Sequence, residues 1–445
     1  MSNKSNDLTV GRLPKQILFL SLPLMLSNLL QVLFNLSDIA VVGKFAGANA
    51  LGSVGSTAIL LTLFLAVPMG LAGGINVLTA LAIGSKSKKD VHTAGVISLI
   101  AGILLLLVGV VFARNILVIL HTKEELIEGA VAYLHIYFLG MPALALYNFG
   151  NAVFSAGGNT KKPLMYLSIA GVLNVILNLF FVIVLKIDVR GVALASAISQ
   201  YVSAFLILKD LFGSHEIYRL RWGEMRLTGH KAKRILQIGV PSAFQYMIYS
   251  VANLFVQSGV NSFSATVVSG NSAAMNADNL VYDIMAAFYT VCGTFMGQNL
   301  GARNKKRVIN SYLISLLYST LIAVVAGMFL VIFSHQFLGL FANDKAVIDA
   351  GVDRLVIMAS CYWLSAAMDC TTAATRALGK TVVPTIIMIL GSCVFRIVWI
   401  YTVFAAFGTT TSIYLLYGVS WLITGIPEVI YFIYIYRKTV HELNL

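Results

Sequence analysis

Long apolar stretches, separated by short polar segments, follow one another along the whole chain. Each stretch has about 20 residues, which is enough for a helix to cross about 30 Å of hydrocarbon. The pattern predicts twelve membrane-spanning helices, approximately at 16–40, 50–76, 91–113, 128–152, 164–185, 190–212, 235–260, 270–297, 308–333, 347–372, 382–405 and 411–436. We therefore expect an all-α integral membrane protein.

Two sequence motifs occur twice in the chain. Residues 84–92 read GSKSKKDVH and residues 301–309 read GARNKKRVI, with the Gly, both Lys and the Val in register at an offset of 217. Residues 157–163 (GGNTKKP) and 378–384 (LGKTVVP) match at Gly, Thr and Pro with an offset of 221. The repetition indicates a duplicated bundle. This organisation is typical of secondary transporters, whose substrate site lies between the repeats.

The boundary between the two copies is predicted at 213–233, the longest basic polar stretch. We interpret 1–212 as an N-lobe with spans 1–6, 213–233 as a cytoplasmic linker and 234–445 as a C-lobe with spans 7–12. Pro23 and Pro241 occupy matching places in the first span of each lobe. Because the number of spans in each lobe is even, both lobes insert with the same orientation. We expect a pseudo-two-fold axis along the membrane normal.

Charged residues are rare, and their distribution predicts the orientation of the chain. Charged residues make up 11% of the chain and hydrophobic residues 58%, whereas about a quarter of a soluble protein is charged. With both termini in the cytoplasm, 23 of the 31 Lys and Arg residues fall in inside segments. Seven, Arg354 among them, fall in outside segments, and Arg396 alone lies within a span. This positive-inside pattern predicts a multi-pass protein of the inner (plasma) membrane.

Several functional classes are disfavoured by the same pattern. The net charge of +13 is scattered over short loops instead of forming one patch, which argues against a nucleic-acid partner. The chain has no HExxH, GxSxG, Walker-type or Cys/His metal motif. We therefore expect no enzyme activity, no metal and no cofactor. The four cysteines fall within spans, where core packing explains them.

Acidic residues within spans are the first functional candidates, because a carboxylate in hydrocarbon is unfavourable unless it faces a cavity or a partner. Five acids fall in spans: Asp38, Asp278, Asp283, Asp369 and Glu428. Asp38 is the strongest candidate, because it shares a helix face with Asn35.

Amide and hydroxyl side chains of other N-lobe spans are candidates to join Asp38. Asn174 and Asn178 lie one turn apart in the fifth span, Ser196 lies in the sixth and Asn148 in the fourth. One carboxylate with such oxygens could bind a proton or a hard monovalent cation such as Na⁺. The alternative is that these groups join helices through hydrogen bonds.

The C-lobe offers a different set of candidate residues. Asn276 and Asp283 fit one face of the eighth span, Asp369 lies deep in the tenth, and Arg396 is the lone base within a span. An unpaired Arg would be unfavourable there, so a structural ion pair of Arg396 with Asp283 or Asp369 is the alternative to a functional role.

Aromatic and sulfur-containing side chains accompany these C-lobe residues. Tyr249 lies in the seventh span and Met285 in the eighth. Such a surface suits flat or cationic organic molecules, although core packing also explains each residue. We expect a cavity lined by Asn276, Asp283, Asp369, Arg396, Tyr249 and Met285.

The motifs, in this order on a duplicated chain, resemble the multidrug and toxin extrusion (MATE) family over nearly the full length. Residues 36–43 (LSDIAVVG) are similar to the family's Asp-Thr-x-x-x-Gly region. Residues 158–163 (GNTKKP) are similar to its Gly-Asp-Thr-x-x-Pro loop, and 376–384 (RALGKTVVP) to the C-lobe counterpart. Residues 297–302 (GQNLGA) are similar to its Gly-Gln-x-x-Gly-Ala element.

The resemblance implies an antiporter that exports organic, cationic or amphipathic, drug-like compounds through rocking of two lobes, driven by H⁺ or Na⁺. The N-lobe cation site would consist of Asp38, Asn148, Asn174, Asn178 and Ser196. Asn178 stands where many members carry a second acid, which leaves the coupling ion open. We expect a monomer in the lipid bilayer. The alternative is a lipid-linked precursor flippase of the same superfamily, which usually has cationic residues lining its cavity.

Overall fold

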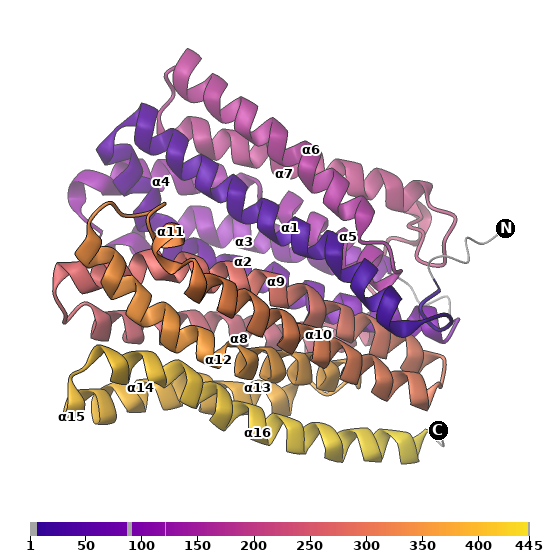
Figure 1. Ribbon diagram of the computed structural model, residues 1–445. Helices are drawn as coiled ribbons and strands as arrows, with labels where there is room; N and C mark the ends of the chain where they lie inside the picture. Colours follow the sequence, from indigo (N-terminus) through magenta and orange to yellow (C-terminus); the bar gives the residue numbers. More distant parts are fainter. Residues whose placement is uncertain (1–6, 87–90, 121, 444–445) are drawn as a thin grey trace. The chain divides into compact units, whose positions relative to one another are not determined.

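The structure, a computed structural model, describes residues 7–86, 91–120 and 122–443, and all regular elements in these ranges are helical (Figure 1). The elements before the linker are α1 (Leu13–Val41), η2 (Val42–Ala46), α2 (Ala48–Gly84), α3 (His92–Ile119), α4 (Glu124–Leu139), α5 (Met141–Ala156), α6 (Lys161–Leu179), η3 (Phe180–Val184) and α7 (Val189–Gly213). The later elements are η4 (Trp222–Glu224), α8 (Gly229–Val260), α9 (Ala265–Gly301), α10 (Lys305–Ile332), α11 (Ser334–Leu338), α12 (Lys345–Ala377), α13 (Val382–Met388), η5 (Ile389–Val394), α14 (Phe395–Trp399), η6 (Ile400–Phe404), α15 (Ala405–Phe407) and α16 (Thr410–Glu442).

Two compact units divide the chain. Unit 1 contains residues 26–244 and unit 2 contains residues 8–25 and 245–445. The helices α1 and α8 therefore each belong to both units, and each changes unit a few residues after a proline, Pro23 or Pro241. The lobe boundaries inferred from the sequence, with a linker at 213–233, stay a prediction.

The helices confirm an all-α membrane protein. Nine helices of the described part are long and apolar enough to cross a membrane, and the pair α4 and α5 makes a tenth candidate. The predicted span 128–152 is thus two helices that meet at a bend of 47°. Pro142, the second residue of α5, cannot donate a backbone hydrogen bond to α4. The predicted spans 235–260 and 347–372 are helical, as α8 and α12, but they are not among these nine helices.

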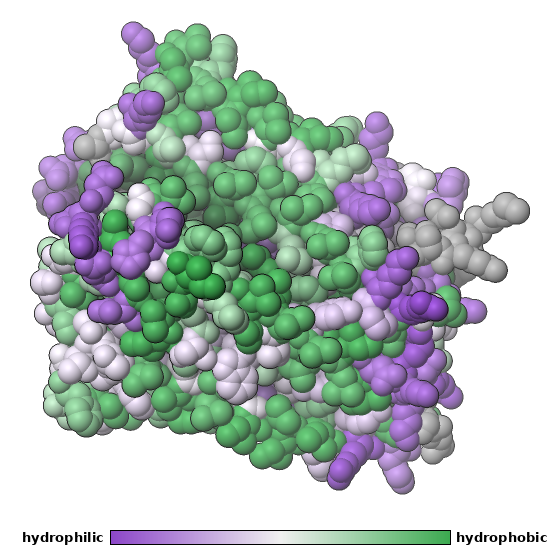
Figure 2. Space-filling view, viewed as in Figure 1, coloured by the Kyte–Doolittle hydropathy of each residue, from purple (hydrophilic) through white to green (hydrophobic). Residues whose placement is uncertain are grey.

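Exposed apolar side chains show where the helices meet lipid. Figure 2 shows apolar residues over much of the visible face, with polar residues gathered toward the helix ends. Val111, Ile332 and Val184 are each more than 60% exposed although they lie in or beside long apolar helices. A soluble protein rarely exposes such a continuous apolar surface, so the chain is a multi-pass membrane protein.

The duplicated motifs have the same backbone geometry in both copies. Gly158 and Gly379 have positive φ angles of 76° and 80°. In both copies these glycines end a helix in a Schellman motif, the left-handed turn in which glycine is favoured. Lys86 and Arg303, at the matching place in the other motif, also have positive φ, 51° and 57°. Residues 87–90 of the first copy, including Lys88 and Lys89, lie outside the described residues.

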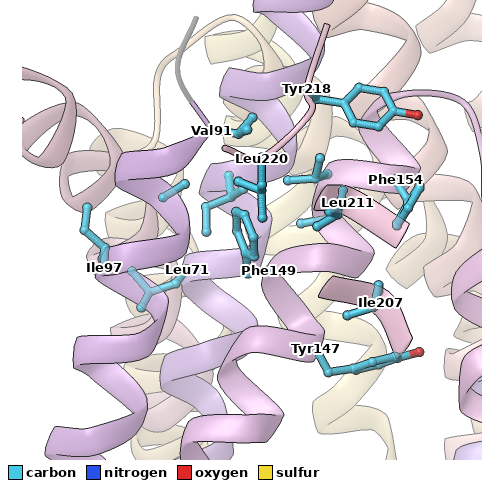
Figure 3. Packing of buried hydrophobic residues seen from close by; sticks show 14 of the residues in the cluster. Leu71, Val91, Ile97, Tyr147, Phe149, Phe154, Ile207, Leu211, Tyr218 and Leu220 are labelled. Atoms are coloured by element: carbon cyan, nitrogen blue, oxygen red, sulfur yellow. The ribbon is translucent and has the colours of Figure 1, made fainter. Parts of the chain in front are cut away.

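The linker before α8 is packed onto unit 1. Figure 3 shows Tyr218 and Leu220 of this segment with Phe149, Phe154 and Leu211 in one apolar core. Two hydrogen bonds fix the segment to the start of α3: the Arg221 backbone amide donates to His92 Nε2 at 2.9 Å, and the Thr93 hydroxyl donates to the Arg226 carbonyl at 3.0 Å.

The start of the chain is held on unit 2 in a comparable way. Arg307, at the start of α10, donates to the backbone carbonyls of Leu8 and Gly11 at 2.9 and 2.8 Å. Asn299 of α9 donates to the same Leu8 carbonyl at 3.2 Å and accepts from Arg307 Nε at 3.0 Å. Arg307, which belongs to the duplicated motif at 301–309, thus anchors the segment that precedes α1 together with Asn299.

Candidate functional site

The carboxylate of Asp38, in the last turn of α1, accepts hydrogen bonds from two other helices of unit 1. The Asn178 side chain of α6 donates to Oδ1, and the Ser196 hydroxyl of α7 donates to Oδ2 at 3.3 Å. The Asn174 amide donates to Ser196 Oγ at 3.3 Å, and its Oδ1 accepts from Asn178 at 3.2 Å. The structure therefore brings together four predicted residues, which we name the Asp38 network: Asp38, Asn174, Asn178 and Ser196.

Local helix geometry positions this network. Asn174 and Asn178 are four residues apart on α6 and therefore share a face. Gly171 lies one turn earlier, and a Cβ there would come within 1.8 Å of the Phe34 ring on α1, so only glycine permits this approach of α1 to α6. The π-helical segments η2 and η3 begin shortly after Asp38 and Asn178. Such turns often occur at functional sites, because they break the regular hydrogen bonding of a helix.

The charge of Asp38 has no permanent counter-charge. Among the described residues, no Lys, Arg or His lies within ion-pair distance of this carboxylate. Asn178 is fully buried, and in this part of the structure its Oδ1 atom has no hydrogen-bond partner. A carboxylate and an amide oxygen in this state are unfavourable in a membrane interior. The arrangement can relieve that cost by taking up a proton or a cation.

Asn148 does not join the network in this structure. It lies on α5, and its amide donates to the Leu144 carbonyl of its own helix at 2.9 Å. Its inclusion in the cation site stays a prediction. The tyrosines of α4 lie nearer, since Tyr133 and Tyr137 interact electrostatically with Asp38. No pattern in the sequence distinguishes these two tyrosines, because their distance from Asp38 depends on how α4 packs.

Arg396 of unit 2 is completely buried among neutral partners. Its guanidinium donates to the Ser420 hydroxyl at 3.1 Å, to Asn253 Oδ1 at 3.0 Å and to the Tyr249 hydroxyl at 3.0 Å. It also lies over the rings of Tyr249 and Tyr417, at 4.8 and 4.7 Å from their centroids. Arg396 makes no ion pair with a carboxylate in the described ranges, so the pairing with Asp283 or Asp369 considered above is not formed.

Asp369 of α12 interacts with a serine of its own helix and with tyrosines of other helices. Its Oδ2 accepts a hydrogen bond from Ser365, one turn earlier on α12, at 3.3 Å. It interacts electrostatically with Tyr249, Tyr282 and Tyr289, which come from α8 and α9. The hydroxyls of Tyr282 and Tyr289 are 3.4 Å apart. A partly exposed carboxylate beside aromatic rings can attract an organic cation through both charge and ring faces.

The remaining predicted residues of α9 divide by burial. Asn276 and Asp283 are partly exposed, and Asn276 donates to the carbonyls of Ser272 and Ala273 at 3.3 Å each. Met285 is 3% exposed and belongs to an apolar core, so packing accounts for it in this structure.

Arg354 corrects the distribution of charge inferred from the sequence. It was assigned to an outside segment, but it lies in α12, is 3% exposed and pairs with Asp278 of α9. Its Nη2 and Nε donate to Asp278 Oδ2 at 2.5 and 3.1 Å, and Tyr362 donates to the other carboxylate oxygen. Arg396 is therefore not the only base within a span. Arg354 falls within the predicted span 347–372, and this was the signal that could have identified it.

Glu428 of α16 is one of the five acids predicted within spans, and no role was predicted for it. It is fully buried, and neither of its carboxylate oxygens has a hydrogen-bond partner in the described part of the chain. It interacts electrostatically with Arg376 and Asp369.

No three His, Cys, Asp or Glu residues in the described ranges lie close enough to hold a metal ion.

Comparisons with known proteins identify the family. The sequence model of the MatE family matches residues 23–180 and 241–402, which is more than half of the chain. The probable multidrug resistance protein YpnP of Bacillus subtilis is 32% identical over 319 residues, covering 68% of this chain and 69% of that protein. A protein of Shewanella oneidensis named as an FAD transporter is 22% identical over 348 residues, covering 76% of each chain.

Solved structures agree with this fold along the whole chain. An outward-facing multidrug resistance MATE family transporter of the MOP superfamily superposes with a TM-score of 0.91 at 22% identity, covering 99% of both chains. A MOP superfamily transporter from Pyrococcus furiosus gives the same TM-score at 21% identity and the same coverage. At this identity the likeness shows the fold, and the match to the family model shows the relationship. The chain belongs to the MatE family of multidrug and toxin extrusion transporters, and is not an enzyme.

Proposed function

We propose that this protein is a cation-coupled antiporter that exports organic, cationic or amphipathic compounds by alternating access of its two lobes. The observation that carries the proposal is the Asp38 network. There, a carboxylate within a span accepts hydrogen bonds only from neutral donors in the described residues. Binding of one positive charge neutralises it, and release restores its charge, which is the change that a coupling site requires.

H⁺ is the coupling ion that we favour. A single proton neutralises Asp38 completely. Na⁺ needs several oxygens and gains from each nearby negative charge, and Asn178 supplies an amide in place of a second carboxylate. The amide and hydroxyl oxygens of Asn174, Asn178 and Ser196 would be the remaining Na⁺ ligands, with Asn148 as a further candidate.

The substrate class is inferred from unit 2. The partly exposed Asp369, with Tyr249, Tyr282 and Tyr289 around it, offers negative charge and ring faces to an organic cation. Asn276 and Asp283 are partly exposed polar residues of the same unit, whereas Met285 and Arg396 are buried. The names of the relatives, which include multidrug resistance proteins, agree with such substrates.

A flippase for lipid-linked precursors is the alternative function. It would require cationic side chains that can reach a lipid phosphate. Arg396 is enclosed by Ser420, Asn253 and Tyr249 and offers no such charge in this structure. This enclosure supports drug export over the flippase.

A resistance panel tests the proposed export. Wild type, Asp38→Asn and Asn148→Ala would be expressed at equal levels in a host that lacks its own efflux pumps. We expect wild type and Asn148→Ala to raise the inhibitory concentrations of cationic dyes and drugs, and Asp38→Asn to leave them at the level of the empty vector. Resistance that persists with Asp38→Asn would remove Asp38 from the mechanism.

The orientation is proposed with both termini and the linker in the cytoplasm, in the inner (plasma) membrane. The polar segment after α7 contains Ser214, which accepts a hydrogen bond from the Glu216 backbone amide at 3.1 Å. In a variant without native cysteines, Ser214→Cys should not react with an impermeant thiol reagent applied outside intact cells. Labelling from outside would reverse the orientation.

A further inference from the structure

A cavity of about 160 Å³ in unit 1 lies at one end of three helices. Its lining comes from the end of α2, from the start of α3 with the preceding Val91, and from the start of α8. None of its lining residues belongs to the Asp38 network. The cavity is therefore a separate feature of this unit.

The walls of the cavity are mostly apolar and buried. Ile75 and Ala82 of α2, Ala94 of α3 and Ile235 of α8 line it, and each is at most 6% exposed. Val91 also lines it and belongs to the apolar core of Figure 3. Thr79 adds a hydroxyl to the wall.

The rim of the cavity is basic. His230, Lys231 and Arg234, in the first two turns of α8, also line the cavity. His230 and Arg234 are exposed, so the basic side chains lie where the cavity meets the surface. Lys233 is also exposed and basic, but it is outside the lining.

The location matches a membrane–water boundary. Two of the lining helices, α2 and α3, are long and apolar enough to cross a membrane, whereas the segment that leads into α8 is polar and carries Arg219, Arg221 and Arg226. His92, which accepts from the Arg221 backbone amide, and Thr93, which donates to the Arg226 carbonyl, hold this segment next to the start of α3. A basic pocket between membrane helices at such a boundary is a known way to bind anionic lipid head groups.

The cavity is smaller than pockets for drug-sized ligands, which have about 300–1,000 Å³. A cavity of about 160 Å³ instead accommodates a segment of an acyl chain. A free phosphate would gain nothing from the apolar walls, and a zwitterionic lipid would gain less from the basic rim. We propose that this cavity binds an anionic phospholipid of the adjacent leaflet. Lys231 and Arg234 contact the phosphate group, and an acyl chain lies against α2.

The lipid site is tested on the purified protein with two single substitutions at adjacent basic residues, Lys233 and Arg234. Native mass spectrometry would count the phosphatidylglycerol and phosphatidylcholine molecules retained by wild type, Arg234→Ala and Lys233→Ala. Both variants lose one exposed positive charge from adjacent positions, but only Arg234 lines the cavity. We expect binding of phosphatidylglycerol to weaken about fivefold in Arg234→Ala and to stay at the wild-type level in Lys233→Ala.

A second measurement separates the acyl chain from the head group. Thermal unfolding of wild type and Ala82→Leu, which fills the cavity, would be followed with phosphatidylglycerol, phosphatidylcholine or inorganic phosphate. We expect phosphatidylglycerol alone to raise the unfolding temperature of wild type, and Ala82→Leu to lose most of that rise. Equal effects of both lipids, an equal effect of phosphate, or equal losses in Arg234→Ala and Lys233→Ala would each overturn the proposal.

Discussion

Asp38 of unit 1 and Asp278 of unit 2 are carboxylates in membrane-spanning helices, and each accepts hydrogen bonds on both oxygens. The donors to Asp38 are the neutral side chains of Asn178 and Ser196. The donors to Asp278 are Arg354 and Tyr362, and Arg354 carries a permanent charge. Asp278 is therefore locked in an ion pair, whereas Asp38 keeps a charge that a proton or cation can neutralise.

The comparison shows that burial of a carboxylate does not by itself indicate transport. Both acids are aspartates within predicted spans, and composition alone does not distinguish them. Their roles differ because of one partner on another helix. A buried ion pair is a structural element whose disruption is strongly destabilising, whereas an uncompensated carboxylate in a membrane is a candidate for function.

The largest effect on transport is expected from Asp38→Asn. The substitution keeps the size of the side chain but removes the only N-lobe carboxylate of the network, so coupled transport should fall to the background of protein-free vesicles. Because the Asp38 charge is uncompensated, its removal should leave the unfolding temperature unchanged or higher. Efflux assays and thermal unfolding on the same preparation measure the transport and the unfolding temperature. A destabilised protein would mean that Asp38, like Asp278, is structural.

Breaking the ion pair between Arg354 and Asp278 should lower stability, in contrast to Asp38→Asn. Arg354→Met leaves Asp278 buried without its counter-charge, and we expect a loss of about 3–5 kcal/mol in stability. Adding Asp278→Asn to Arg354→Met removes the unpaired charge and should restore much of that loss. Thermal unfolding in detergent compares the single and double variants. If the second substitution restored nothing, the ion pair would not explain the burial of Arg354.

A second carboxylate should change the ion preference of the Asp38 network. Asn178→Asp adds a negative charge next to Asp38, and because a cation gains from each nearby charge, Na⁺ should bind at least about tenfold more tightly. Transport by this variant should then respond to a Na⁺ gradient. Asn178→Leu serves as the control without charge or ligand oxygen. A variant that stays indifferent to Na⁺ would contradict our account of how the network selects its ion.

The smallest effect is expected from Asn148→Ala. Asn148 bonds only to the Leu144 carbonyl of its own helix in the described structure, so transport and stability should stay close to wild type, within about 0.5 kcal/mol for stability. Efflux at matched expression checks this. A large loss of transport would show that Asn148 joins the Asp38 network in another conformation, as the family resemblance implies.

Much of the architecture was predictable, because membrane-spanning helices are recognisable in a sequence as apolar stretches of about 20 residues. The repeated Gly158 and Gly379 were visible as a motif, and both occupy left-handed turns. The contact of Asn174 with Asn178 followed from their spacing on one helix. The contact of Asn178 with Asp38 required knowledge of the family, because one sequence does not show which helices are neighbours.

The pairing of Arg354 with Asp278 was missed for a physical reason. Arg354 lies only ten residues from the start of α12, where a basic residue also fits an outside segment. Its burial depends on Asp278, which is 76 positions earlier in the chain. The bend between α4 and α5 was likewise hidden, because apolar composition continues across it while Pro142 changes the backbone.

Gradient-driven efflux in proteoliposomes tests whether the uncompensated carboxylate of Asp38 couples export to H⁺. Wild type and Asp38→Asn would be reconstituted with a fluorescent organic cation, and a pH gradient or a Na⁺ gradient would be imposed alone. The account predicts transport by wild type with the pH gradient, none with the Na⁺ gradient and none by Asp38→Asn with either. Transport by wild type that follows the Na⁺ gradient and ignores the pH gradient would contradict it.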